Sequence, residues 1–234
     1  MNYHYMVGED WSPGNVGDTN RHWKTRFPNF GMCMTNPKNT VSFIPIPRCG
    51  SQFFCNWLVD RYKWRGSHLL SYQTLLKTYM QWKPQYTSTP KYFTILRDPY
   101  ERYVSALWIL WDQDKQTIND HRLDSKSQMD HLFSDPCMKN HHTMNQYNFL
   151  YNVDLSQVAF FNYDDKDMGE KISHYFEKHC NIKFLPELWT PRLSEEKEFL
   201  IEYLNSHPDY MANVKKYLED DYQFLSTIKY YEPN

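Results

Sequence analysis

The 234 residues suit one domain of ordinary size, which can bury most of the surface that its unfolded chain exposes. An aromatic content of 18% with only 7 glycines argues against disorder, collagen-like repeats and flexible linkers. The 26 basic and 28 acidic residues give a net charge of −2, which argues against a nonspecific nucleic-acid coat and a polybasic membrane binder. Any anion that this protein binds must therefore be held by a few well-placed groups.

Targeting signals and cysteine usage indicate a compartment. The sequence has no apolar run long enough to span a bilayer, and its first residues lack the basic and apolar regions of a secretory signal. The five cysteines are odd in number and include no CxxC pair, which argues against a disulfide framework. We expect a cytoplasmic protein, although a catalytic domain cut away from a membrane anchor would have the same composition.

The first elements are an arm, a strand and a helix. Residues 1–40 contain four of the seven glycines and show no sustained period, which predicts an irregular arm packed on a single domain formed by residues 41–234. Residues 41–46 form a β-branched apolar run, which predicts a strand that ends in the turn 47–51. The helix that follows is expected to carry one apolar face, made of Phe53, Phe54, Trp57, Leu58 and Tyr62.

The same order of strand, turn and helix recurs at residues 92–96. Asp98 is a plausible N-cap and Pro99 suits the first helical position, because its missing N–H would have no intrahelical partner there. Glu101, three residues after Asp98, completes a capping-box pattern. A helix is therefore predicted to begin at Pro99, and the polar stretch 112–124 is expected to end it.

The rest of the chain continues the alternation. The apolar run 157–162 predicts a third strand, and residues 168–180 repeat apolar side chains at helical spacing. Residues 194–228 predict two helices broken at His207 and Pro208. Strands that alternate with helices indicate an α/β fold, here a three-layer P-loop-like arrangement with a central parallel sheet flanked by helices.

The turn after the first strand is the first candidate anion site. Such a turn places backbone N–H groups and a helix dipole at the carboxyl edge of the sheet, and Gly50 stands where a chain must pass close to a phosphate. Arg48 stands where nucleotide-binding loops usually have lysine, and its fork can give two donors to one oxyanion. The GxxxxGK[ST] spacing is missing, which favours a metal-free site. The alternative is a plain strand-to-helix turn.

The second candidate anion site follows the second strand. Arg97 ends that strand, and Ser105 lies nearly two helical turns beyond Pro99, on the side that faces back toward the strand end. The two side chains are expected to grip one phosphate. The alternative is that Arg97 pairs with Asp98 or Glu101, while Ser105 only allows close helix packing.

These two segments together resemble a known enzyme family. The first, IPIPRCGSQFF, and the second, YFTILRDPYERYVSAL, are similar to the 5′-phosphosulfate loop and the 3′-phosphate segment of sulfotransferases that use 3′-phosphoadenosine 5′-phosphosulfate (PAPS). The second segment is especially similar to the carbohydrate sulfotransferases. Residues 141–146 and 217–222 are weaker echoes of a His/Gln segment and a closing helix, so the resemblance covers about residues 41–230.

The resemblance implies a role for each matching residue. The amides of the turn would hold the 5′-phosphosulfate, Arg48 would neutralise charge on the bridging oxygen, and Arg97 and Ser105 would hold the 3′-phosphate. Arg192 falls where related enzymes place a late basic loop. The family more often has lysine in place of Arg48 and a hydroxyl residue in place of Gln52. The full set of donor-binding candidates is Arg48, Cys49, Gly50, Ser51, Gln52, Phe53, Arg97, Ser105 and Arg192.

The resemblance also implies a general base between the two motifs. Between Arg65 and Arg97 the chain has no Asp or Glu and one histidine, His68, so we expect Arg48 and His68 to be the catalytic residues. The alternative is a loop histidine that only bonds the backbone, with His141 and His142 as reserve bases. A metal site at Cys137, His141 and His142 is a weak alternative, because no second ligand pair accompanies it.

The predicted activity is transfer of a sulfuryl group from PAPS to a hydroxyl or amine of a carbohydrate or similar small acceptor. The product would be adenosine 3′,5′-bisphosphate, and neither a metal nor a nucleic-acid partner is expected. Two other readings stay open: a P-loop kinase, and a non-catalytic module that binds nucleotide or glycan. The sequence does not predict the oligomeric state.

Overall fold

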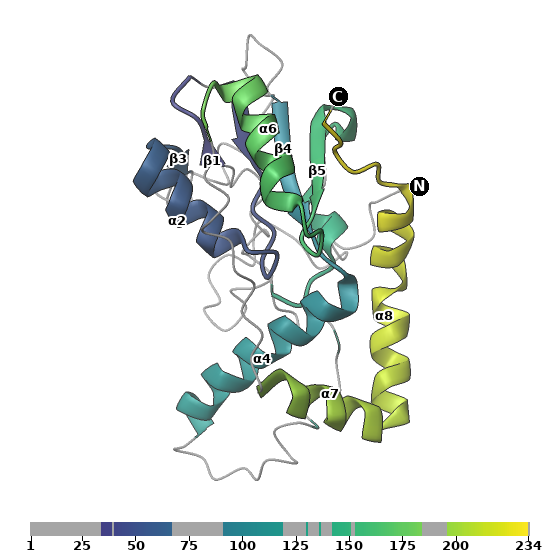
Figure 1. Ribbon diagram of the computed structural model, residues 1–234. Coiled ribbons are helices and arrows are strands. Elements are labelled where there is room, and N and C mark those ends of the chain that lie inside the picture. Colours follow the sequence, from purple (N-terminus) through teal and green to yellow (C-terminus); the bar gives the residue numbers. More distant parts are fainter. Residues whose placement is uncertain are drawn as a thin grey trace, which may run out of the picture. The chain divides into compact units, whose positions relative to one another are not determined.

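The structure, a computed structural model, describes residues 34–38, 40–66, 91–118, 130, 136, 142–150, 153–183 and 196–233 (Figure 1). These residues belong to two compact units. The first unit is drawn from Met1–Arg97, Gln146–Trp189 and Ile228–Asn234, and the second from Asp98–Asn145 and Thr190–Thr227. Among the described residues, no helix combines the length and the apolar character needed to cross a bilayer.

A five-stranded mixed sheet forms the centre of the first unit, with strand order β3-β1-β2-β4-β5. Its strands are β1 (Met34–Thr35), β2 (Val41–Phe43), β3 (Arg65–Gly66), β4 (Lys91–Leu96) and β5 (Val158–Asn162). β2, β4 and β5 are parallel, as predicted, whereas β1 runs antiparallel to both β2 and β3. The α/β class with a central set of parallel strands is therefore confirmed, and the antiparallel pairing of β1 at this edge is an addition that the sequence did not predict. Strands of two residues are too short to leave a periodic pattern.

β2 is shorter than the six residues predicted from the sequence, and proline explains where it ends. The N–H of Ile44 still donates to the carbonyl of Phe93 at 2.9 Å, which extends the pairing with β4 by one bond. Pro45 then has no N–H to donate, so the ladder stops. The strand therefore ends here, and the turn 47–50 follows at its carboxyl end.

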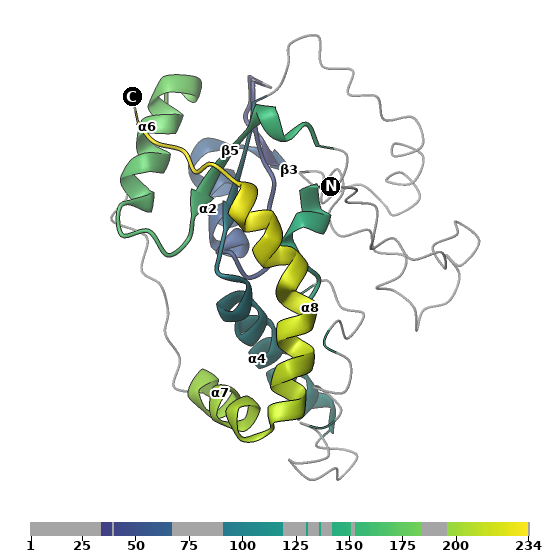
Figure 2. The ribbon, with the colours of Figure 1, turned by 90° about the vertical axis from the view of Figure 1, so that its right-hand side faces the viewer.

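Two helices of the first unit, α2 (Ser51–Tyr62) and α6 (Met168–Cys180), cover the same face of the sheet (Figures 1 and 2). The ring centroids of Phe54 and Phe43 lie 5.8 Å apart, and those of Phe176 and Phe93 lie 5.2 Å apart. Phe53, however, is 39% exposed, which corrects its predicted place on the buried face. Its position lies about 100° around the helix from Phe54, so its ring points past the edge of that face.

The end of the chain returns to the first unit. Tyr230 forms a parallel bridge with Phe160, and the N–H of Tyr231 donates to the carbonyl of Phe160 at 2.8 Å. The ammonium of Lys171 on α6 donates to Glu232 and also to Asp165, each at 2.9 Å. Two 3₁₀ helices, η4 (Gln146–Leu150) and η5 (Leu155–Gln157), precede β5.

Three helices make up the described core of the second unit: α4 (Pro99–Ile118), α7 (Glu196–Ser206) and α8 (Pro208–Thr227). Their buried contacts include Tyr103, Val104, Leu107, Leu200, Leu204, Val214 and Leu218. The predicted start of α4 is confirmed, because the N–H of Glu101 donates to the Asp98 carboxylate at 2.9 Å. The predicted break between two C-terminal helices is confirmed as well, since His207 separates α7 from α8.

Candidate functional site

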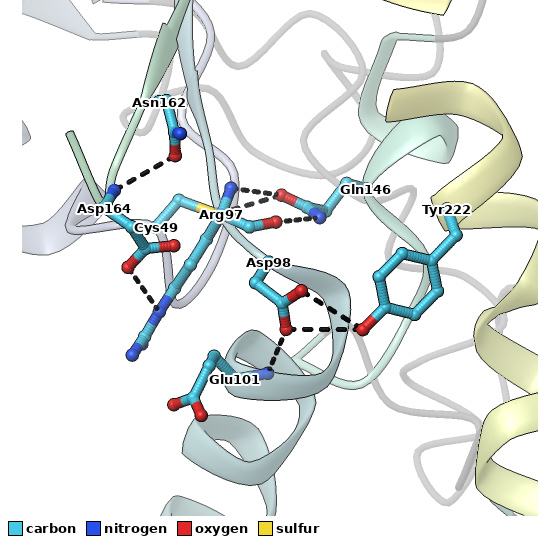
Figure 3. Close-up of polar contacts among 8 residues, drawn as sticks. All are labelled: Cys49, Arg97, Asp98, Glu101, Gln146, Asn162, Asp164 and Tyr222. Atoms are coloured by element: carbon cyan, nitrogen blue, oxygen red, sulfur yellow. Dashed lines mark hydrogen bonds and ion pairs between the residues drawn. The ribbon is translucent and has the colours of Figure 1, made fainter. Parts of the chain in front are cut away.

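The carboxyl ends of the three parallel strands carry the predicted site residues of the first unit. The turn 47–50 follows β2, Arg97 follows β4, and Tyr163 and Asp164 follow β5. Because these strands are neighbours in one parallel sheet, their carboxyl ends meet at one edge, where ligands of α/β folds bind. Figure 3 shows Cys49, Arg97 and Asp164 close together at this edge.

The turn after β2 has an uncommon backbone. Arg48 has φ of 68° and Gly50 has φ of 72°, both in the left-handed region, and the N–H of Cys49 donates to the carbonyl of Ile46 at 3.2 Å. A left-handed residue other than glycine costs on the order of 1 kcal/mol or more, and such strain gathers at functional sites. Left-handed residues in a tight turn also direct backbone N–H groups into a concavity that suits an anion.

The start of α2 adds a second feature that favours an anion beside this turn. The N–H of Phe54 donates to the carbonyl of Gly50 at 3.1 Å, so Gly50 is the N-cap, and Ser51, Gln52 and Phe53 form the first turn. First-turn amides of an α-helix have no acceptor inside the helix, and they form the positive end of its dipole. The first turn of α2 contains no acidic residue. The turn and the helix start therefore favour an anion at the same place.

Arg97 supplies the second positive group at this edge. Its side chain is only 10% exposed, and its guanidinium carbon lies 4.7 Å from the centre of the Tyr163 ring. Its Nε lies 4.0 Å from a carboxylate oxygen of Asp164, a long ion pair to a half-exposed side chain. Sequence reasoning considered neither Tyr163 nor Asp164, although both directly follow the predicted third strand.

The pKa of Tyr163 responds to the charges around it. Burial raises the pKa of the Tyr163 phenol, and the positive charges of Arg97 and Arg48 act in the opposite direction. The neighbouring Asp164 raises this pKa further. The phenol therefore stays protonated at neutral pH, and Tyr163 presents a neutral ring to the guanidinium of Arg97.

Gln146, at the start of η4, joins the turn to the end of β4 (Figure 3). Its side-chain Nε2 donates to the carbonyl of Arg97 at 2.8 Å, and its Oε1 accepts the Arg97 N–H at 3.0 Å. The same Oε1 accepts from the thiol of Cys49 at 3.3 Å. Sequence reasoning named Gln146 only as part of a family-like segment and gave it no role.

The structure does not test the remaining candidates. His68, His141 and Arg192 lie outside the described residues, as does Cys137 of the weak metal pattern. Ser105 is buried on α4, and the half-buried His142 belongs to the second unit too. The predicted grip of Arg97 and Ser105 on one phosphate, and the choice of general base, stay predictions.

Comparison with known proteins identifies the family. Neither the curated proteins nor the solved structures include a match to this chain. A family model described as the sulfotransferase family matches residues 32–225, which include the sheet, the turn 47–50, Arg97 and most of α8. A match over so much of the sequence, around a turn and an arginine arranged for anion binding, shows that the chain belongs to the sulfotransferase family.

Proposed function

We propose that this sulfotransferase moves a sulfuryl group from PAPS to a hydroxyl of a carbohydrate or a similar polar acceptor. The observation that carries the proposal is the left-handed turn at Arg48 and Gly50, which leads into α2 at the sheet edge that also holds Arg97. The carbohydrate acceptor rests on the resemblance of the segment around Arg97 to the carbohydrate sulfotransferases. Neutral hydroxyls of other small molecules are the nearest alternative.

The residues at the sheet edge fit the donor. PAPS carries two separate anionic groups, a 5′-phosphosulfate and a 3′-phosphate, and this edge offers two separate positive centres. The turn and the first turn of α2 supply backbone donors for one group, and the guanidinium of Arg97 supplies a largely buried charge for the other. The net charge of −2 is no obstacle, because these local groups decide the binding.

The proposed chemistry needs two further contributions from the chain. As the acceptor oxygen forms its bond to sulfur, the bond from sulfur to the bridging phosphate oxygen breaks, and the hydroxyl proton must pass to a base. Arg48 is the proposed stabiliser of the charge left on the bridging oxygen. His68 is the proposed base, with His142 in reserve, because an imidazole can accept a proton at neutral pH. Ser105 and Arg192 are proposed as donor ligands from the family resemblance.

Thermal unfolding with added nucleotides tests the donor. Adenosine 3′,5′-bisphosphate at a hundred times its dissociation constant should stabilise the protein by about 2.7 kcal/mol, and ATP with Mg²⁺ should not. The shift should disappear in Arg97→Ala. A shift with ATP and Mg²⁺ alone would favour a kinase instead, and no shift with the bisphosphate would reject the proposed donor.

Transfer of labelled sulfate tests the acceptor and the base. Incubation with labelled PAPS and a panel of glycans should label at least one of them, whereas labelling only of small phenols or amines would reject a carbohydrate acceptor. His68→Ala should lower kcat by a factor of about 10² to 10⁴, the usual contribution of a general base. If His68→Ala keeps its turnover while His142→Ala loses it, the base is His142.

A further inference from the structure

We propose that Gln146 is a positioning residue that sets both halves of the donor site. This inference rests on the proposed function. One buried amide side chain, 0% exposed, bonds the backbone of Arg97 and the side chain of Cys49 (Figure 3). Arg97 belongs to the proposed 3′-phosphate half, and Cys49 belongs to the turn of the proposed 5′-phosphosulfate half.

The bonds to Arg97 fix the backbone from which its guanidinium departs. The ladder between β4 and β5 ends at the pair Leu96 and Asn162, so Arg97 is the first residue beyond it. Beyond the ladder, the side-chain amide of Gln146 bonds both the N–H and the carbonyl of Arg97, as a paired strand residue would. The direction in which the Arg97 side chain leaves the sheet therefore depends on Gln146.

The bond to Cys49 ties the turn to the same oxygen. Cys49 is 1% exposed and lies between the left-handed residues Arg48 and Gly50. Its thiol donates to the Oε1 that also accepts from the N–H of Arg97. A buried amide that loses its hydrogen-bond partners is destabilised, so this shared oxygen resists movement of the turn relative to the strand end.

Positioning by Gln146 predicts a pattern across ligands that carry one phosphate each. Adenosine 3′-monophosphate reports on the Arg97 half, and adenosine 5′-monophosphate reports on the turn. Gln146→Leu should weaken the binding of both monophosphates, and it should raise the Kd of adenosine 3′,5′-bisphosphate at least about tenfold. This effect does not require Gln146 to touch the ligand. Cys49→Ala should weaken only the 5′-monophosphate, because it removes only the link to the turn.

The experiment is isothermal titration of the three nucleotides into the full chain, with kcat and KM for PAPS measured in parallel. If Gln146→Leu fails to fold, Gln146→Glu is the substitute variant. It keeps the acceptor for the Arg97 N–H but faces the Arg97 carbonyl with an oxygen, so it should weaken chiefly the binding of the 3′-monophosphate. Cys49→Ser should restore most of the binding that Cys49→Ala loses, since a hydroxyl also donates. Asn148→Ala is the matched control, because Asn148 is a second buried amide on η4.

The outcomes separate this inference from the proposed function. Asn148→Ala should lower the melting temperature and leave all three Kd values unchanged, whereas Gln146→Leu should raise Kd and the KM for PAPS more than it lowers kcat. If the wild-type protein binds the bisphosphate and Gln146→Leu binds it equally well, the positioning role is rejected and the proposed function stands. If the wild-type protein binds none of the three nucleotides, both are rejected.

Discussion

Arg48 and Gly50 share a left-handed backbone, and the same geometry should make their substitutions behave in opposite ways. Gly50→Ala puts a Cβ at φ of 72°, which should cost about 1 to 2 kcal/mol of stability. Arg48→Gly removes a Cβ at φ of 68°, which should keep or raise stability by up to about 1 kcal/mol, because the relief of strain is partly offset by a more flexible unfolded chain.

Urea denaturation and PAPS-dependent turnover, measured on the same samples, check this pair. Both variants should lose turnover, Gly50→Ala because the turn is distorted and Arg48→Gly because a charge beside the proposed donor is gone. Arg48→Lys is the control, since it restores the charge but not the two-donor fork, and it should recover part of the turnover. A stable Arg48→Gly variant with full turnover would show that the strained arginine serves another purpose.

Asp98 is a second residue whose contribution to stability follows from its contacts. It accepts from the N–H of Glu101 at the start of α4 and from the hydroxyl of Tyr222 on α8 at 3.1 Å (Figure 3). Burial, followed by the charge of Asp98, raises the pKa of Tyr222 to about 12, so its hydroxyl stays a donor at all ordinary pH values.

Substitutions should separate the two contacts of Asp98. Asp98→Ala should cost about 1 kcal/mol from the lost cap and more from the unpaired hydroxyl, while Asp98→Asn keeps a good cap and should cost less. Tyr222→Phe removes the second contact but leaves the cap, and it should cost about 0.5 to 1 kcal/mol, because Tyr222 is 44% exposed. Chemical denaturation measures all three. Equal losses for Asp98→Ala and Asp98→Asn would mean that the charge, not the cap, matters.

At the scale of the helix, the last turn of α6 should make stability depend on pH. The ammonium of Lys91 donates to Nδ1 of His179 at 2.9 Å, which requires that nitrogen to be unprotonated. Burial, and then the charges of Lys91, Lys178 and His174, lower the pKa of His179 below its ordinary 6.5. The unfolded chain therefore binds more protons just below pH 6.5, and stability should fall as pH falls through that range.

Denaturation across pH 5 to 8 checks this expectation. His179→Gln should flatten the dependence below pH 6.5, because the titrating group is gone. Lys91→Gln should flatten it only in part, since burial is the larger cause of the lowered pKa. If the slope is the same in the wild-type protein and in His179→Gln, another group titrates in this range.

The elements differ in how well the sequence predicts them, and the reason is the range of the interactions that define them. α4 and α6 begin where predicted, because caps, proline and helical spacing are local signals. β1 and β3 have two residues each and exist only through pairing with each other and with β2, which no local pattern records. The contacts of Gln146 with Arg97 and Cys49 were missed for the same reason, since these partners lie 49 and 97 residues away in the sequence.

The place of three candidate site residues in the sheet was predictable from the order of the elements. Arg48, Gly50 and Arg97 come to one sheet edge because each follows a strand of the same parallel set, which the order of elements already implies. The left-handed φ of Arg48 was not predictable, because arginine has no preference for that region, and only the turn in three dimensions requires it.

At the scale of the whole molecule, the path of the chain bears on how it unfolds. The first unit is assembled from three separate segments and the second from two, so the chain passes between the units four times, after Arg97, Asn145, Trp189 and Thr227. Neither unit can be excised as one continuous piece. We therefore propose that the two units, with β1 included in the sheet of the first, fold as a single domain with one cooperative unfolding transition.

Unfolding followed by two probes tests that proposal. Far-ultraviolet circular dichroism reports mainly on helices of both units, and hydrogen exchange of amides in β4 and in α8 reports on each unit separately. A single domain should give coincident transitions, and adenosine 3′,5′-bisphosphate should shift both together, because a ligand that binds the native state stabilises the whole cooperative unit. Two transitions, with only that of β4 raised by the bisphosphate, would show instead that the second unit is an independent domain.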